Sequence, residues 1–201
     1  MISILTGDII NSQGLNPDEW LKSLKKVLTK YAKETIAWEI FRGDSFQVET
    51  TPELALELAV KIKLSIKQFE DMDVRIAIGF GDKSYSAQKI TESNGTAFVN
   101  SGECFEKLKK NTLAIKTPNP KFDYTINTMF QLALLTMDNW TINSVKFIQG
   151  ALDNPKMNQK DFAKLLGKSQ STVSEGLKRS GFYELQLLLE YFKNKVKDTK
   201  W

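Results

Sequence analysis

Two aspartates in the first third of the sequence are the residues best suited to chemistry. Asp8 ends an apolar segment in Thr6-Gly7-Asp8-Ile9-Ile10, and Asp44 lies in the turn-like sequence Arg42-Gly43-Asp44-Ser45. Carboxylate oxygens are the ligands that Mg²⁺ prefers, and a pair of bound Mg²⁺ ions can hold a triphosphate for in-line attack. Gly-Asp is also a common turn dipeptide, so each aspartate alone is equally consistent with a structural turn. If both meet at one edge of a sheet, they predict a metal and nucleotide site.

A second cluster of polar residues, near the C-terminus, is suited to binding DNA. The segment 159–179 predicts two short helices around Gly167, which permits a sharp turn, with Ser169 as the cap of the second helix. The expected inward residues are Phe162, Ala163, Leu166, Val173 and Leu177. The expected DNA-contacting residues are Ser169, Gln170, Ser171, Thr172, Ser174, Lys178 and Arg179. This pattern is typical of a helix-turn-helix that reads double-stranded DNA, and an ordinary helical hairpin is the alternative.

Composition excludes several classes of chemistry. The 201 residues contain no histidine and one cysteine, Cys104, which excludes Ser-His catalysis, His-ligated zinc and an internal disulfide. No apolar run approaches the roughly 20 residues of a membrane-spanning helix. Residues 157–201 carry nine Lys and Arg against five Asp and Glu, which accounts for the whole net charge of +4. We therefore expect a cytoplasmic protein without membrane contact, whose basic segment is the helix-turn-helix.

The elements that must position Asp8 and Asp44 alternate between strands and helices. Helices are expected to begin at Asn16-Pro17 and at Thr51-Pro52. Strands are expected at residues 2–10, 35–41, 46–50 and 74–80. The resulting order, β-α-β-β-α-β, is that of a ferredoxin-like domain with two helices on one face of an antiparallel sheet. Because its first strand lies beside the hairpin strands, the two carboxylates are expected to converge. The fold class is therefore predicted to be α+β.

The remainder of the chain predicts a polar loop region and then an all-α domain. Residues 81–102 are rich in Ser, Thr, Asn and Gly and are expected to form a loop, followed by a short helix at 103–110 and an edge strand at 113–117. Pro118 and Pro120 interrupt both helix and sheet, so we place the boundary between domains 1–120 and 121–201 there. Helices are expected beyond it at 124–137, 142–152 and 182–196.

Four short motifs resemble those of class III nucleotidyl cyclases. They are Gly7-Asp8-Ile9 after an apolar strand, Gly43-Asp44-Ser45-Phe46 at a hairpin, Arg75-Ile76-Ala77-Ile78-Gly79 on a strand, and Gly95-Thr96-Ala97 before a helix. This resemblance covers about residues 1–117 and implies that Asp8 and Asp44 hold Mg²⁺ with a nucleoside triphosphate. Over nearly the whole chain, including Trp140-Thr141 ahead of the helix-turn-helix, the sequence resembles the SatD family of bacterial proteins.

The sequence departs from the cyclases where the transferred phosphate would be stabilised. In cyclases the helix after the last motif carries an Asn and an Arg. Here Asn100 matches the Asn, but Cys104 stands near the position of the Arg. A missing cation at this point weakens transition-state stabilisation. Lys107 or Lys109 could replace it only in a different helix register. The resemblance therefore implies a nucleotide-binding role for Asn100 and Lys107, with turnover lost.

Together these patterns favour a DNA-binding transcriptional regulator with a degenerate cyclase-like domain that senses a nucleotide. The alternative is an active nucleotidyl cyclase, or another metal-dependent phosphoryl-transfer enzyme, with an accessory helical domain. A third possibility is a protein whose two domains only dock partners.

One recognition helix covers few base pairs, and class III domains place their sites at dimer interfaces, so we also expect a homodimer. The apolar stripe of Leu185, Leu188, Leu189 and Phe192 is either its contact or part of the domain's own core.

Overall fold

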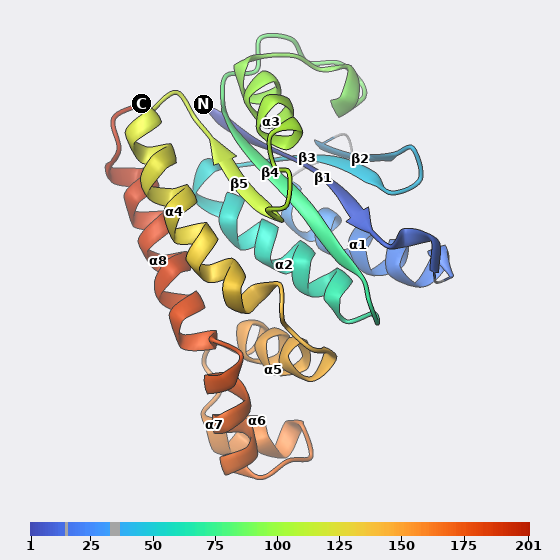
Figure 1. Ribbon diagram of the computed structural model, residues 1–201, viewed down its shortest axis with the longest axis vertical. Coiled ribbons are helices and arrows are strands. Elements are labelled where there is room, and N and C mark those ends of the chain that lie inside the picture. Colours follow the sequence, from blue (N-terminus) through green and yellow to red (C-terminus); the bar gives the residue numbers. More distant parts are fainter. Residues whose placement is uncertain (15, 33–36) are drawn as a thin grey trace.

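The computed structural model describes residues 1–14, 16–32 and 37–201 and has the α+β class that the sequence predicts. A five-stranded mixed sheet has the order β2-β3-β1-β4-β5 (Figure 1). Its strands are β1 (Ile2–Ile10), β2 (Trp38–Phe41), β3 (Ser45–Thr50), β4 (Asp73–Gly81) and β5 (Leu113–Lys116). β1 is antiparallel to both of its neighbours, and the edge strand β5 is parallel to β4. Thr35 and Ile36, where we expected the second strand to begin, lie outside the described residues.

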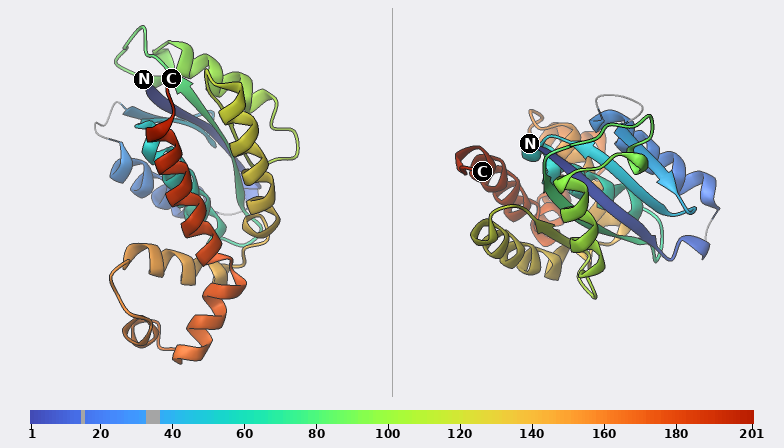
Figure 2. Two further views of the ribbon diagram at one scale, coloured as in Figure 1. Left: turned by 90° about the vertical axis from the view of Figure 1, so that its left-hand side faces the viewer. Right: turned by 90° about the horizontal axis from the view of Figure 1, so that it is seen from above.

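The described part of the chain contains eight α-helices. They are α1 (Pro17–Tyr31), α2 (Ala55–Lys67), α3 (Thr96–Glu106), α4 (Pro120–Met137), α5 (Ile142–Asp153), α6 (Gln159–Leu165), α7 (Gln170–Arg179) and α8 (Phe182–Asp198). Helices α1 and α2 cover one face of the sheet and α3 covers the other, while α4 and α8 lie side by side (Figure 1). Helices α5, α6 and α7 lie at the end of the molecule remote from both termini (Figure 2).

Alternation along β1 and β4 gives the sheet one mainly apolar face and one mixed face. Leu5 of β1 and Ile78 and Phe80 of β4 are buried in the main core, which also contains α1 and α2. On the opposite face β1 presents Thr6 and Asp8, because successive side chains of a strand point to opposite sides. The alternation therefore places Asp8 on the α3 side of the sheet.

Helix α3 begins at Thr96 and not at residue 103, so it occupies part of the segment that we expected to be a loop. Its first turns are rich in residues with low helix propensity, which is why the pattern was missed. The close fit to β4 compensates for this propensity. A Cβ atom at Gly79 would overlap the backbone of Ser101, and one at Gly81 would overlap Ala97. Two glycines on the strand thus allow the helix to pack directly on the sheet.

Helix α4 begins at Pro120, earlier than the expected residue 124, because Asn119 caps it by accepting a hydrogen bond from the Phe122 amide at 3.1 Å. Proline is favourable as the first helical residue. From α4, Asn127 accepts a hydrogen bond from the backbone N–H of Ile115 at 2.9 Å and donates one to its C=O at 2.8 Å. The amide side chain satisfies backbone groups on the edge strand β5, so α4 protects that edge.

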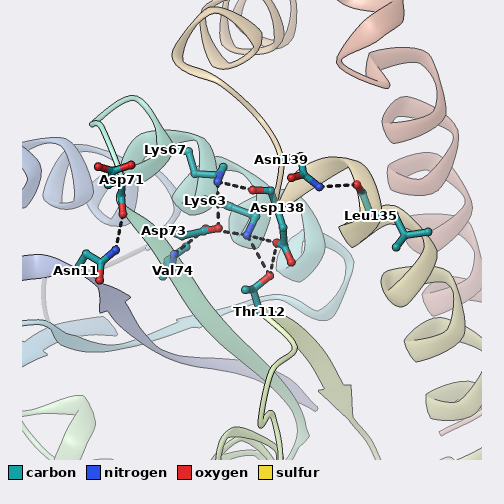
Figure 3. Close-up of polar contacts among 10 residues, drawn as sticks. All are labelled: Asn11, Lys63, Lys67, Asp71, Asp73, Val74, Thr112, Leu135, Asp138 and Asn139. Carbon is teal, nitrogen blue, oxygen red and sulfur yellow. Dashed lines mark hydrogen bonds and ion pairs between the residues drawn. The ribbon is translucent and has the colours of Figure 1, made fainter.

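Helix α2 is buried on all sides. It lies between the sheet, α1 and the C-terminal helices, so even its lysines are covered. The Lys63 side chain is 3% exposed and pairs with Asp73 and Asp138, each at 2.7 Å, as Figure 3 shows. Lys67 contacts Asp73 at 3.1 Å and donates to the Asp138 carbonyl at 2.8 Å. These contacts connect the start of β4 to the end of α4.

A continuous core runs from the sheet into the C-terminal helices. Phe192 of α8 is fully buried and its ring packs against Phe80 of β4, Phe122 and Phe130, with ring centroids 6.2–6.3 Å apart. The stripe on α8 that offered a dimer contact therefore packs largely within this chain: Leu185 and Phe192 are buried in the core, and Leu188 and Leu189 pack against it. Buried contacts cross the predicted domain boundary at residue 120. The division into two domains stays a prediction.

Candidate functional site

Asp8 lies on the mixed face of the sheet and is already paired with a cation. Arg75, its direct partner across β1 and β4, donates Nε to Asp8 Oδ1 at 2.9 Å and a second hydrogen bond to Oδ2. The guanidinium also lies 5.5 Å from the ring centroid of Phe105, a cation–π contact from α3. The hydrogen bonds from Arg75 to Asp8 raise the pKa of the guanidinium above its already high value. The Asp8 carboxylate is thus neutralised by a bidentate ion pair.

Asp44 lies close to Asp8 in the backbone but has its own partner. Asp8 is paired across the strands with Ser45, and the Asp44 carbonyl accepts a hydrogen bond from the Ile9 amide at 3.1 Å. The Asp44 carboxylate accepts a hydrogen bond from Ser12 Oγ at 2.9 Å. Within the residues that the structure describes, no group of three or more His, Cys, Asp or Glu is placed to hold a metal. In this arrangement the side chains do not fit a divalent cation, because the Arg75 guanidinium already pairs with both carboxylate oxygens of Asp8.

The residues that were expected to contact a nucleotide lie on or beside α3. Asn100 donates its amide to the Phe80 carbonyl at 2.8 Å, which attaches the helix to β4. Lys107 is the C-terminal cap of α3, with a well-exposed side chain 3.9 Å from Glu103. Cys104 points into a small apolar cluster with Ala77 of β4, and burial raises the pKa of its thiol to about 12. The position near which cyclases carry an Arg is therefore neutral and covered here.

The segment 159–181 contains two short helices, α6 and α7, joined by a hydrogen-bonded turn. Asn158 and Ser169 cap α6 and α7 by accepting hydrogen bonds from backbone amides three residues ahead, at 3.0 and 3.1 Å. Gly167 has a φ of +61°, its amide donates to the Lys164 carbonyl at 3.0 Å, and the Lys168 amide donates to the Ala163 carbonyl at 2.9 Å. This pair of bonds is a Schellman motif, which ends a helix and fixes the direction of the chain that follows.

Two further glycines allow α5 to cross close to both helices. A Cβ at Gly150 of α5 would lie 2.6 Å from the ring of Phe162, and one at Gly176 of α7 would lie 2.5 Å from the ring of Phe147. Phe162, Ala163, Val173 and Leu177 are buried, as the sequence predicted, and Leu166 packs against the same core. Helix α5 thus supports the pair, and α7 is held at a fixed angle with one face toward solvent.

The outward face of α7 carries the residues that were expected to contact DNA. Ser169, Gln170, Ser171, Thr172, Lys178 and Arg179 are exposed, and Ser174 is half-buried. At the start of the helix Ser169 Oγ lies 2.9 Å from Ser171 Oγ and 2.8 Å from Thr172 Oγ1. Among the ion pairs of the described residues, none involves Lys178 or Arg179. The face therefore offers hydroxyl groups at one end and two cations at the other.

Comparison with protein-family models assigns the chain to a family. The model described as "SatD family (SatD)" matches residues 2–198, which covers the sheet and all the C-terminal helices. The chain belongs to the SatD family. Comparison of this SatD-family chain with curated proteins and with solved structures found no match. Among its described residues, no helix is both long and apolar enough to cross a membrane.

Sequence reasoning missed the partners of the charged residues in this SatD-family chain. Arg75 was noticed as part of a motif but not as the partner of Asp8, because the two meet only through the register of β1 and β4. Lys63 and Lys67, one helical turn apart in an apolar helix, were also overlooked. Buried lysines require acidic partners, so their presence was a signal for Asp73 and Asp138.

Proposed function

We propose that this SatD-family protein is a cytoplasmic DNA-binding transcriptional regulator that uses α7 as its recognition helix in the major groove. The observation that carries the proposal is the outward face of α7, where short hydrogen-bonding side chains are followed by Lys178 and Arg179 without ion-pair partners in the described chain. Hydroxyl and amide groups suit base edges, and cations suit phosphates. The capped turn and the support from α5 are what a rigid reading helix requires, because base contacts depend on a fixed orientation.

The first 120 residues form, in this proposal, a cyclase-like module that senses a nucleotide without turning it over. Its element order and the strand order β2-β3-β1-β4 are those of a ferredoxin-like sheet, which supports the resemblance to cyclases. Loss of turnover is supported by the buried, neutral Cys104 and by the pairing of Asp8 with Arg75. Metal with nucleotide at Asp8 and Asp44 then requires that Arg75 first leave Asp8.

The competing proposal is an active nucleotidyl cyclase or related phosphoryl-transfer enzyme. It is favoured by the backbone placement of Asp8 in β1 opposite Ser45, the first residue of β3, with Asp44 in the turn just before it. Incubation of the protein with ATP or GTP and Mg²⁺ or Mn²⁺, followed by product analysis, separates the two functions. Unchanged nucleotide supports the regulator, whereas a cyclic nucleotide or released pyrophosphate would establish the enzyme. Binding without turnover, measured by calorimetry, would support the sensing role.

DNA binding is tested by selecting bound sequences from a random duplex pool and then comparing variants on the selected site. Arg179→Ala should weaken binding by about 1–3 kcal/mol on that site alone if the side chain contacts a guanine edge. If Arg179 binds phosphate, the loss should be similar on all sequences and the dependence of affinity on salt should become shallower. Lys25→Ala, which removes an exposed cation from α1, is the matched control and should bind normally. Equal binding by Arg179→Ala and the wild type would refute the assignment of α7.

We also propose that the protein binds DNA as a homodimer, because one recognition helix covers few base pairs. The selected sequences should then contain two inverted half-sites about one helical turn apart. Light scattering at micromolar concentration, with and without DNA, measures the assembly directly. A species of 22.9 kDa alone, together with a single half-site, would show that the chain acts as a monomer.

A further inference from the structure

A groove with an apolar floor lies between α4 and the corner where α7 turns into α8. Its volume is about 500 Å³, within the range of pockets that hold small organic molecules. The aliphatic side chains that line it are Met129, Leu132, Ala133, Met137, Leu185 and Leu188, and Trp140 adds an aromatic ring. Its lining residues come from α4, α7, α8 and the adjoining turns. The groove is thus separate from the sheet face that carries Asp8, and the proposed nucleotide does not account for it.

The walls of the groove are fixed by two contacts at the α7–α8 corner. Trp140 donates its indole Nε1–H to the Ser180 carbonyl at 2.8 Å, which fastens the corner to the turn after α4. Gly181 adopts the left-handed conformation with a φ of +68°, and a Cβ there would lie 3.1 Å from Cγ2 of Thr136. The corner is therefore pressed against α4. A preformed groove of this kind binds a ligand with little loss of protein entropy.

The mouth of the groove is cationic. Lys178 and Arg179 both line it, both are exposed, and neither forms an ion pair within the described residues. Glu184 is the one acidic residue in the lining, which leaves an excess of one positive charge. A guanidinium can bind a carboxylate through two parallel hydrogen bonds. An apolar floor beside an unmatched cationic mouth complements a molecule with an apolar body and an anionic end.

We propose that this groove binds a medium-chain carboxylate, with its alkyl chain along Leu132 and Leu188 and its carboxylate at Lys178 and Arg179. A second copy of the chain fits the groove less well. Residues 157–201 form one wall of the groove and carry the excess positive charge. In a symmetric contact this positive segment would face its own copy, and the like charges would repel. The same two cations are those that we expect to hold DNA phosphates. The carboxylate therefore competes with DNA, a consequence that rests on the proposed function, whereas binding in the groove does not.

The site is tested on the full-length protein with decanoate as the probe and decanol as the neutral control. Calorimetry should give saturable binding of one decanoate per chain, and methyl NMR shifts should centre on Met129, Leu132 and Leu188. Decanol should bind at least fivefold more weakly, because it lacks the charge. Absence of saturable binding, shifts spread over the whole protein, or shifts that follow protein concentration and so report self-association would each overturn the site.

Matched variants separate specific binding from a detergent-like effect. Leu188→Glu places a negative charge on the groove floor and should abolish binding. Leu187→Glu changes the adjacent residue, which is 67% exposed and lies outside the groove, and should leave binding unchanged. Because Leu188→Glu could disturb folding, Arg179→Gln provides a second test at an exposed position and should weaken decanoate at least fivefold. Equal affinity in Arg179→Gln and the wild type, or equal losses in both leucine variants, would overturn the proposal.

A competition experiment with DNA distinguishes an error in the groove assignment from an error in the proposed function. With a selected duplex, saturating decanoate should weaken DNA binding at least fivefold, and by reciprocity DNA should weaken decanoate binding by the same factor. Bound decanoate with unchanged DNA affinity would overturn the competition but not the site. Bound decanoate in a protein that selects no DNA would overturn the regulator proposal and leave the groove assignment standing.

Discussion

At the scale of single residues, the pairing of Asp8 with Arg75 sets the charge on the α3 side of the sheet. The two side chains are partly exposed, and Phe105 holds the guanidinium from the α3 side. A carboxylate in a bidentate pair has little charge left for a metal ion, so the metal site that we propose requires this ion pair to open. Replacing Arg75 is therefore the most informative test of whether Asp8 can bind a metal ion.

Arg75→Gln should therefore increase the affinity for divalent cations. The amide cannot neutralise Asp8, whose charge then becomes available near the turn that carries Asp44. We expect Mn²⁺ to bind at least tenfold more tightly to Arg75→Gln than to the wild type, as measured by paramagnetic resonance. The double variant Arg75→Gln with Asp8→Asn should return to the wild-type value. Tight binding to the wild type, with no gain in Arg75→Gln, would mean that the guanidinium does not control this site.

Cys104 makes a prediction about pH. Burial raises the pKa of its thiol to about 12 in the folded chain, whereas an unfolded thiol titrates near about 8.5. Above that lower value the unfolded state loses its proton first, so the free energy of unfolding falls as the pH rises toward 12. The contribution is fully present below about pH 8.5, and its loss is at most about 1.4 kcal/mol per pH unit.

Chemical unfolding measured at about pH 7.5 and at about pH 10 should show this loss. Cys104→Ala lacks the thiol and should lose less stability over the same interval. The pKa of Tyr31 is also raised, by burial and by its hydrogen bond to Glu57. Tyr31 is present in both proteins, so its effect on the pH dependence of stability cancels in the comparison. Parallel pH profiles for the two proteins would contradict the assignment to Cys104.

At the scale of elements, α2 is the centre of the molecule. Its lysines reach acidic groups on three sides: Lys61 binds Asp153 at the end of α5, and Lys63 joins the start of β4 to the end of α4. These pairs differ in exposure, because the Asp153 side chain is 55% exposed whereas the partners Asp73 and Asp138 are 16% and 34% exposed. A buried pair depends on both of its members much more than an exposed one does.

Lys63→Met and Lys61→Met form a matched pair of variants on this helix. Methionine keeps most of the apolar stem, so the difference reports the charge. Lys63→Met leaves two poorly hydrated carboxylates with fewer partners and should lower the free energy of unfolding by about 3 kcal/mol. Lys61→Met should cost less than about 1 kcal/mol, because water can solvate Asp153. Urea unfolding measures both, and equal losses would show that burial of the partners does not matter here.

Element by element, the sequence predicted regular structure well where local signals agree with packing. Asn16 caps α1 before Pro17, and the turn at Gly167 ends α6, both as expected from local chemistry. The start of α3 was missed because its stability comes from Gly79 and Gly81 on a distant strand. The candidate site follows the same rule. Its residue types were visible in the sequence, but the contact of Asp8 with Arg75 depends on strand register, which local patterns do not determine.

At the scale of the whole molecule, the sheet and the C-terminal helices share one apolar core. Phe192 of α8 lies against aromatic rings from β4 and α4, and α8 also packs beside the turn that precedes α2. The proposed boundary at residue 120 therefore passes through buried contacts. Units that share a core are expected to unfold together, so the two proposed domains should not be thermodynamically independent.

Phe192→Ala tests this continuity. Removal of a fully buried ring should lower the free energy of unfolding by about 3–5 kcal/mol. If the core is shared, amide exchange of β1 and of α8 should accelerate together. Tyr191→Ala, which changes an exposed neighbour, is the control and should have little effect. Faster exchange confined to α4–α8, with β1 still fully protected, would show instead that the first 120 residues fold on their own.

Both ends of the chain are anchored near the same strand end. The N-terminal amine lies 3.5 Å from Asp82, and the ring of Trp201 packs against Phe80 with centroids 5.4 Å apart. Both ends also lie opposite α6 and α7 along the long axis (Figures 1 and 2). A short linker could therefore join them, and the chain could be reopened at the exposed Lys109-Lys110 turn to give a circular permutant with the same fold. The same geometry leaves room for a fluorophore or a surface tether at either end, where it would not obstruct the helix that we expect to meet DNA.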